Sequence, residues 1–182
     1  MTWKSTPSGY SNTAIFLHWL AVILIVATYC LMLFKGQYPK NSPGRNTMAL
    51  WHYMCGLSVF ALVWVRLIVR LSGADPLIEP ALPRWQSLLA DTMHWALYLL
   101  MVALPLLGWA TLSARGADIP FFGLHLPALV GKSDALAKTL KDFHETGATV
   151  GYFLIGGHAV AALFHHYVTR DNTLRLMLPR RR

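Results

Sequence analysis

Four long runs of apolar residues constrain this chain more strongly than any other feature of its sequence. They cover residues 14–34, 50–71, 93–112 and 143–168. An α-helix needs about 20 mostly apolar residues to cross the hydrocarbon core of a bilayer, and each run is long enough. Only 13% of the residues are charged, about half the share in a soluble domain. The sequence therefore predicts an all-α fold: an integral membrane four-helix bundle that forms a single domain over residues 1–182.

The charged residues are mostly basic, and their distribution predicts an orientation. The chain has 16 Lys and Arg against 8 Asp and Glu, a formal net charge of +8. A basic protein can bind nucleic acid, but the apolar runs favour lipid headgroups as the anionic partner, so no nucleic acid is expected. Four spans place both termini on one side. Nine basic residues lie there, among them Arg180, Arg181 and Arg182, against seven on the other side. This bias predicts cytoplasmic termini.

Histidines occur where a bilayer disfavours them. Five of the eight, at positions 18, 52, 94, 144 and 158, lie within the apolar runs or at their edges. An ionisable group in hydrocarbon is costly and usually functional, and a neutral imidazole is a common metal ligand. His144 and His158 are 14 residues apart, which on a helix places them within about 40° of one face and about 21 Å apart along the axis. The fourth run therefore predicts two ligand positions at different depths.

Depth then selects the partners of these two ligands. His52 begins the second run on the outer side, as His144 does in the fourth, whereas His18 and His158 lie toward the inner side. A haem needs a ligand on each face and small residues beside it. The fourth run supplies Gly and Ala, with Gly151 midway between the two histidines; the alternative is that these residues only allow close helix packing. No CxxCH motif occurs, so the sequence predicts two non-covalent haem b groups in the bundle core, held by His18 with His158 and by His52 with His144.

Several segments together resemble a known family. They are "HWL" in the first run, "WH" opening the second, and "FHETGATVGYFLIGGHAVAALFHHY" followed by "DNTLRLMLPRRR". These segments are similar to the bacterial cytochrome b561 family, and the resemblance extends from the first run to the tail. It implies a di-haem cytochrome of the bacterial inner membrane with the same iron-ligand pairs. It also implies an oxidoreductase that takes electrons from superoxide at the outer haem and reduces ubiquinone near the inner one.

Further residues are candidates for tuning these sites. His165, seven residues after His158 and on nearly the same face, would contact the quinone or deliver its protons. Arg66 would bind a propionate of the inner haem, or else extend its charge to the headgroups. For His94 a packing hydrogen bond is expected, with a quinone or propionate contact as alternatives. Seven basic residues against four acidic ones on the outer side would steer superoxide, or only solvate the loops.

Three classes of function remain open on the sequence. The first is the superoxide:quinone oxidoreductase. The second is a di-haem electron carrier that links the quinone pool to a periplasmic or membrane redox partner, although no partner protein is indicated. The third is a transporter that uses the buried histidines, which is disfavoured because transporters are usually longer and built from repeats.

Overall fold

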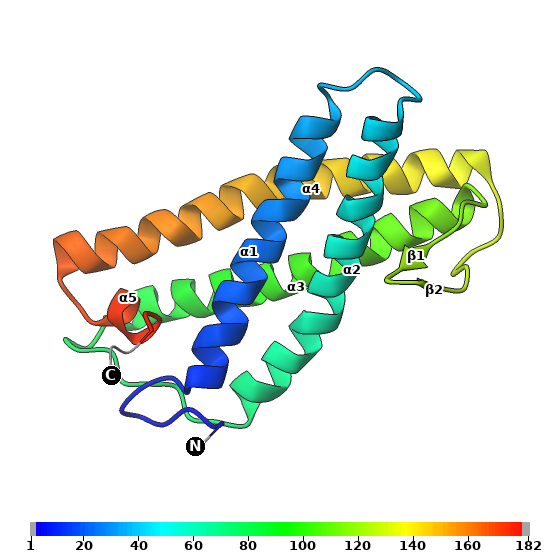
Figure 1. Ribbon diagram of the computed structural model, residues 1–182. Helices are drawn as coiled ribbons and strands as arrows, with labels where there is room; N and C mark the ends of the chain where they lie inside the picture. Colours follow the sequence, from blue (N-terminus) through cyan, green and yellow to red (C-terminus); the bar gives the residue numbers. More distant parts are fainter. Residues whose placement is uncertain (1–2, 180–182) are drawn as a thin grey trace. The chain divides into compact units, whose positions relative to one another are not determined.

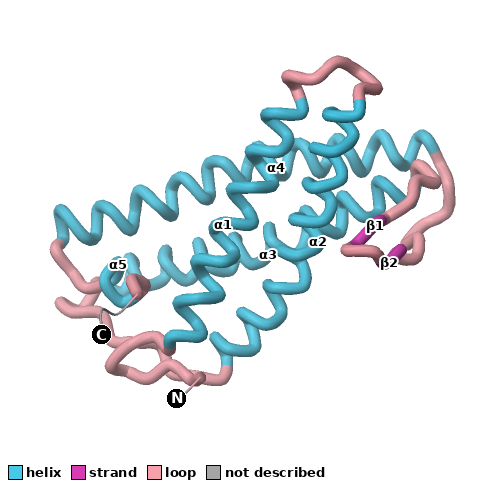
Figure 2. The backbone as a smooth tube through the Cα atoms, viewed as in Figure 1, coloured by secondary structure: helices cyan, strands magenta, loops and turns pink. Residues whose placement is uncertain are grey.

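The computed structural model describes residues 3–179 and is mostly helical (Figure 1). Its long helices are α1 (Asn12–Lys35), α2 (Pro43–Leu71), α3 (Arg84–Ala114) and α4 (Asp134–Phe164). After α4 come a π-helical turn, η1 (His165–Thr169), and the short α5 (Thr173–Leu176). A small hairpin of β1 (Pro120–Phe121) and β2 (Leu124–His125) lies in the connection between α3 and α4 (Figure 2). The predicted all-α fold class is confirmed, while Arg180, Arg181 and Arg182 lie outside the described residues.

The four long helices are long and apolar enough to cross a membrane, and three begin well before the predicted runs. Helix α2 begins at Pro43 rather than residue 50, α3 at Arg84 rather than 93, and α4 at Asp134 rather than 143. Hydropathy detects the apolar part of a helix, whereas helix ends are set by capping. The Ser42 and Ser133 hydroxyls accept hydrogen bonds from backbone N–H groups in the first turns of α2 and α4, at 3.3 Å each.

Large apolar side chains on these helices face outward. Phe16, Phe153 and Val160 are 64%, 77% and 65% exposed. A water-soluble protein rarely exposes so much apolar surface. In a bilayer these side chains contact lipid, and the helical backbone satisfies its own hydrogen bonds.

By its internal contacts the chain separates into two units, and each long helix contributes a segment to both. The first unit comprises Met1–Leu20, Leu62–Leu99 and Val150–Arg182, and the second comprises Ala21–Ala61 and Leu100–Thr149. The single domain over residues 1–182 stays a prediction.

Local contacts fix the loops within each unit. In the first unit, the backbone N–H of Ala74 donates to the Ser5 carbonyl at 3.1 Å, which holds the segment before α1 against the α2–α3 loop. In the second unit, Leu57, Leu112 and Ile119 form a buried cluster that places the hairpin loop against α2 and α3.

Candidate functional site

The second unit brings together His52 of α2 and His144 of α4. Their ring centroids are 6.1 Å apart and the ring planes are inclined by 77°. The Nδ1 atom of His52 lies 3.0 Å from the Thr28 carbonyl oxygen, and that of His144 lies 2.9 Å from the Leu104 carbonyl oxygen. A carbonyl can only accept, so both rings carry their proton on Nδ1 and leave the Nε2 lone pair free. This is the tautomer in which histidine ligates a metal through Nε2 while a second group holds the ring.

A cavity adjoins this pair. Among its lining residues are His52, Gly56, Gly108 and His144. A methyl group on Gly108 would lie 3.4 Å from Cε1 of His144, so a glycine here lets α3 approach the imidazole closely. Apart from its chain neighbours and the adjoining backbone of α2, a methyl group on Gly56 would have no protein atom within 4 Å. The space beside Gly56 is therefore not filled by the polypeptide.

Glycines of α4 have more than one role. A methyl group on Gly147 would come within 2.8 Å of Cδ2 of Leu104, so this glycine permits close packing of α4 against α3. Gly156 instead faces open space, since no atom lies within 4 Å of the position of its missing side chain. Gly151, expected between the two ligands, is buried.

The first unit brings together His18 of α1, His94 of α3 and His158 of α4. The ring centroids of His18 and His158 are 6.4 Å apart, and those of His94 and His158 are 5.6 Å apart. Within residues 3–179, the buried Nδ1 atom of His94 has no hydrogen-bond partner. The structure therefore gives this nitrogen no packing hydrogen bond of the kind expected from the sequence.

Arg66 of α2 contacts one of these imidazoles directly. One guanidinium nitrogen, Nη2, lies 3.2 Å from Nδ1 of His18, and the guanidinium carbon lies 5.8 Å from the centroid of the Tyr98 ring. Arginine can only donate, so in this arrangement Nδ1 of His18 accepts, and a neutral His18 carries its proton on Nε2. Unlike His52 and His144, His18 would therefore ligate a metal through Nε2 only after Arg66 has released its Nδ1. No salt bridge to Arg66 occurs within residues 3–179. A partly buried guanidinium without a carboxylate partner is a suitable site for an anionic group.

The spacing within both pairs suits an iron held between two imidazoles. A metal–nitrogen distance of about 2.0 Å on each side and a ring radius of about 1.1 Å would separate the two centroids by about 6.2 Å. The observed 6.1 Å and 6.4 Å agree with this value. The His94–His158 separation of 5.6 Å is shorter. Across the described chain no group of three or more His, Cys, Asp or Glu side chains could hold a metal ion. A haem iron needs only two side chains, because the porphyrin supplies its other ligands.

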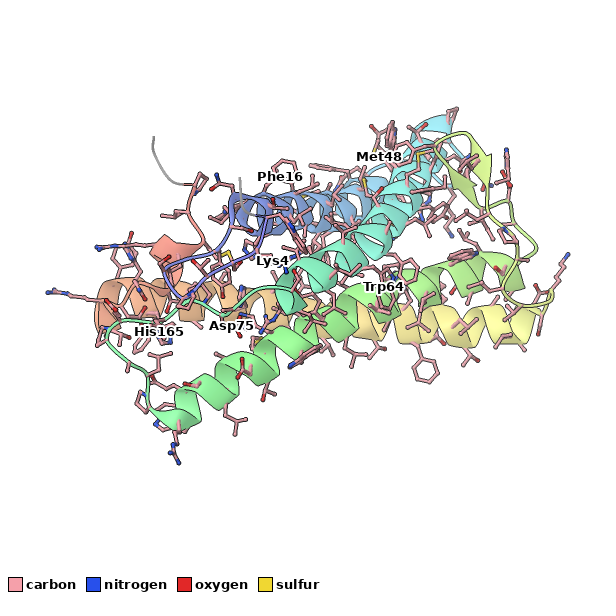
Figure 3. The ribbon with its side chains drawn as sticks, turned by 90° about the horizontal axis from the view of Figure 1, so that it is seen from below. Lys4, Phe16, Met48, Trp64, Asp75 and His165 are labelled. Atoms are coloured by element: carbon pink, nitrogen blue, oxygen red, sulfur yellow. The ribbon has the colours of Figure 1, made fainter. Side chains whose placement is uncertain are left out.

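His165 belongs to a separate arrangement in the first unit. It begins η1 at the C-terminal end of α4, where Figure 3 labels it. Its Nδ1 donates to the Asp171 carboxylate at 2.5 Å. Burial raises the pKa of Asp171, but hydrogen bonds from His165 and from the Thr173 backbone N–H outweigh this effect, so its net pKa is lowered. The His165–Asp171 pair therefore contains an ionised carboxylate.

Sequence reasoning missed Asp171. It lies after the last apolar run, where no periodicity marks it. The one signal that could have found it is that an Asp two residues before Thr173 can cap a helix. The structure buries it to 2% exposure. Of the other histidines, His125 is exposed and donates to Asp118 at 2.7 Å.

Comparison with known proteins places these observations in a family. A family model described as prokaryotic cytochrome b561 matches residues 9–180. The chain belongs to the prokaryotic cytochrome b561 family. This confirms the resemblance noted in the sequence, and the four apolar helices together with the family make the chain a multi-pass membrane protein. Members of the cytochrome b561 family are membrane electron carriers that bind b-type haem.

Individual relatives cover almost the whole chain. Cytochrome b561 homolog 1 of Escherichia coli strain K12 is 42% identical over 173 residues, 95% of this chain and 98% of the relative. The probable superoxide oxidase CybB of Yersinia pestis is 38% identical over 173 residues, 95% of this chain and 97% of the relative. Cytochrome b561 homolog 2 of E. coli K12 is 27% identical over 179 residues, 98% of this chain and 95% of the relative.

Proposed function

We propose that this cytochrome b561 oxidises superoxide at the outer face of the inner membrane and reduces ubiquinone near the inner face, using two haem b groups. The observation that carries the proposal is the pair of two-imidazole sites, one in each unit, with ring separations of 6.1 Å and 6.4 Å. The similarity to a probable superoxide oxidase supports the choice of substrate. When bound, the two haems supply one-electron carriers that join the two half-reactions.

Four histidines would hold the iron atoms. His52 and His144 would hold the iron of the outer haem, and His18 and His158 would hold that of the inner haem. For His18 this requires Arg66 to turn away from Nδ1, so that the proton can move to Nδ1 and leave Nε2 free. The Thr28 and Leu104 carbonyls orient the outer ligands and raise their basicity by accepting from Nδ1. Arg66 is the proposed partner of an inner propionate, because it is a partly buried cation that lacks a carboxylate within the described chain.

Positive charge gathers beside the outer pair. Lys35 interacts electrostatically with His52, and Arg45 and Arg115 in turn act on Lys35. Two of the acids in this unit are already engaged, since Glu145 binds Lys141 at 2.6 Å and Asp118 binds His125. The remaining positive field would attract a small anion and raise its encounter rate.

His165 is the proposed proton donor or contact for ubiquinone. Converting a quinone to a quinol consumes two electrons and two protons, and a histidine close to the acceptor is well suited to deliver protons near neutral pH. His165 keeps Nε2 available because its Nδ1 proton is engaged by Asp171.

Reconstitution tests the proposed reaction. The purified holoprotein in lipid nanodiscs receives superoxide from an enzymatic source and a short-chain ubiquinone, and quinol is followed by its absorbance. We expect quinol formation that superoxide dismutase abolishes. Quinone reduction that persists with dismutase, or no quinol at all, would rule the reaction out.

Salt should slow the reaction with superoxide. Raising the ionic strength from about 0.01 M to 0.15 M shortens the Debye length from about 30 Å to about 8 Å, which screens the field of the lysines and arginines. We expect the second-order rate constant for superoxide to fall several-fold, measured by stopped-flow absorbance of the haems. The rate with an uncharged reductant should stay nearly constant. A salt-independent superoxide rate contradicts electrostatic steering.

A bulky side chain at Gly56 should compete with the outer haem. Gly56→Leu would clash with little in the polypeptide, because no atom lies within 4 Å of the added Cβ, but it would fill space beside His52 and His144. We expect about one haem per chain instead of about two, measured as pyridine haemochrome against protein mass. Gly131→Leu is the matched control, since Gly131 also has open space but lies in the α3–α4 loop. An unchanged ratio in Gly56→Leu would place the haem elsewhere.

A second candidate function is an electron-carrier subunit that links the quinone pool to a periplasmic or membrane redox partner. It is favoured by the name of the 42% identical relative, which specifies a cytochrome and no substrate. The reconstitution separates the two functions, because a carrier of this kind would take up electrons from quinol or a partner protein without oxidising superoxide.

Orientation is also part of the proposal, with both termini in the cytoplasm. Reporter domains fused to the C-terminus test this placement. A C-terminal fusion that is active only in the periplasm would show that the outer and inner faces are assigned the wrong way round.

A further inference from the structure

We propose that Asp171 is a positioning residue for His165, the histidine proposed to deliver protons to the quinone. By accepting a hydrogen bond from Nδ1, Asp171 fixes the tautomer of His165, so that Nε2 is the nitrogen that exchanges protons with the quinone. The inference rests on the proposed quinone reduction and deepens it. The relevant observation is a hydrogen bond of 2.5 Å between the His165 imidazole and the Asp171 carboxylate. The next residue, Asn172, anchors this segment by hydrogen bonds to Leu77 and Glu79.

The local backbone creates this pairing. Helix α4 ends in the π-helical turn η1, and Arg170 takes a left-handed conformation with φ of 59°. The backbone N–H of Asp171 then donates to the His165 carbonyl at 3.1 Å. Single π-helical turns occur often at functional sites because they re-aim one side chain. Here the reversal directs the Asp171 carboxylate back to the His165 imidazole.

Each oxygen of Asp171 accepts from a different donor. One oxygen accepts from Nδ1 of His165 and the other from the backbone N–H of Thr173, at 2.9 Å. The carboxylate side chain is fully buried, whereas the His165 side chain is 19% exposed. A buried carboxylate with two donors is fixed in orientation and compensates a positive charge on the imidazole. His165 can therefore take up and release a proton at Nε2 without turning its ring.

The proton balance of the step is simple. The quinone accepts two electrons, one from each of two superoxide oxidations, and two protons, and it leaves as quinol. In each of two cycles, the N–H bond at Nε2 of His165 breaks as an O–H bond forms on the quinone. Water from the inner side then returns a proton to Nε2. Asp171 keeps its charge throughout and holds the Nδ1 proton.

The Asp171→Asn variant tests this role because an amide cannot accept with both of its heavy atoms. If the amide oxygen stays on the Thr173 N–H, its NH₂ group faces Nδ1, and His165 must move its proton to Nε2. A wrong tautomer of this kind strongly impairs histidine catalysis in the serine protease triad. We expect the turnover number for quinone reduction to fall by about 10- to 100-fold, with the KM for quinone changed by less than about twofold because the ring remains in place.

A control variant separates positioning from loop stability. Asn172, the next residue, holds the same segment: its side chain donates to the Leu77 carbonyl at 3.2 Å and accepts from the Glu79 backbone N–H at 3.0 Å. Asn172→Ala removes these two bonds and leaves the Asp171 pairing intact. We expect its quinone turnover to stay within about twofold of the wild type. An equal loss in both variants would overturn the proposal, because loop anchoring would then explain the effect.

Two further measurements do not depend on quinone turnover. ¹⁵N NMR of histidine-labelled holoprotein, with the His165 signal assigned through His165→Gln, should show the proton on Nδ1 in the wild type and on Nε2 in Asp171→Asn. Haem reduction by superoxide without quinone, which consumes no proton, should be unchanged in Asp171→Asn. An unaltered His165 tautomer refutes the role of Asp171. If the wild type reduces no quinone while the tautomer responds as expected, quinone reduction is refuted and the Asp171–His165 coupling remains.

Discussion

Replacing His144 with alanine should remove one haem and abolish the reaction with superoxide. His144 and His52 provide the only imidazole pair proposed for the outer site, and a haem that lost one of these two histidines would be bound more weakly. We expect about one haem per chain in place of about two, measured as pyridine haemochrome against protein mass. Superoxide should no longer reduce the remaining haem above the background rate, as followed by stopped-flow absorbance.

Two comparison variants make this result specific. His125 is a histidine of the same unit, but its side chain is 70% exposed and bound to Asp118, so His125→Ala should keep both haems. His144→Met supplies a thioether, which also ligates haem iron, and should retain more haem than alanine while raising the reduction potential. Two haems in His144→Ala would show that the outer ligand pair is assigned wrongly.

Replacing His158 with alanine should remove the other haem and stop ubiquinone reduction. The first unit contains three neighbouring imidazoles, and we propose His18 and His158 as the pair that holds the iron. Their centroid distance of 6.4 Å is close to the value for two ligands on one iron, whereas His94 lies at 5.6 Å from His158. We therefore expect about one haem per chain in His158→Ala and about two in His94→Ala, again by pyridine haemochrome.

The kinetic consequence separates the inner site from the outer one. In His158→Ala, superoxide should still reduce the remaining haem in stopped flow, while quinol formation in nanodiscs falls to background. If His94→Ala lost a haem and His158→Ala kept both, His94 rather than His158 would be the histidine that holds the inner haem. The distances between the imidazole rings would then not identify the histidines that hold the iron.

The sequence by itself determined the helices and the family resemblance, and it predicted which histidines form pairs. Apolar runs of about 20 residues have few alternatives to helices in a bilayer. The 14-residue interval between His144 and His158 follows from helical periodicity alone. For the same reason, the pairing of His52 with His144 and of His18 with His158 required only the direction in which each helix runs. The structure brings both predicted pairs together, at 6.1 Å and 6.4 Å.

Only the tertiary structure decided which groups surround those histidines. The carbonyls of Thr28 and Leu104 that set the tautomers come from α1 and α3, and backbone carbonyls carry no residue-specific signal. The contact of Arg66 with His18 joins residues 48 positions apart. Asp171 depends on a backbone reversal after η1 that hydropathy does not detect. Periodicity describes the direction of side chains along one helix, whereas hydrogen-bond partners depend on how separate segments pack. For this reason the four apolar runs predicted the two histidine pairs but not the groups that orient them.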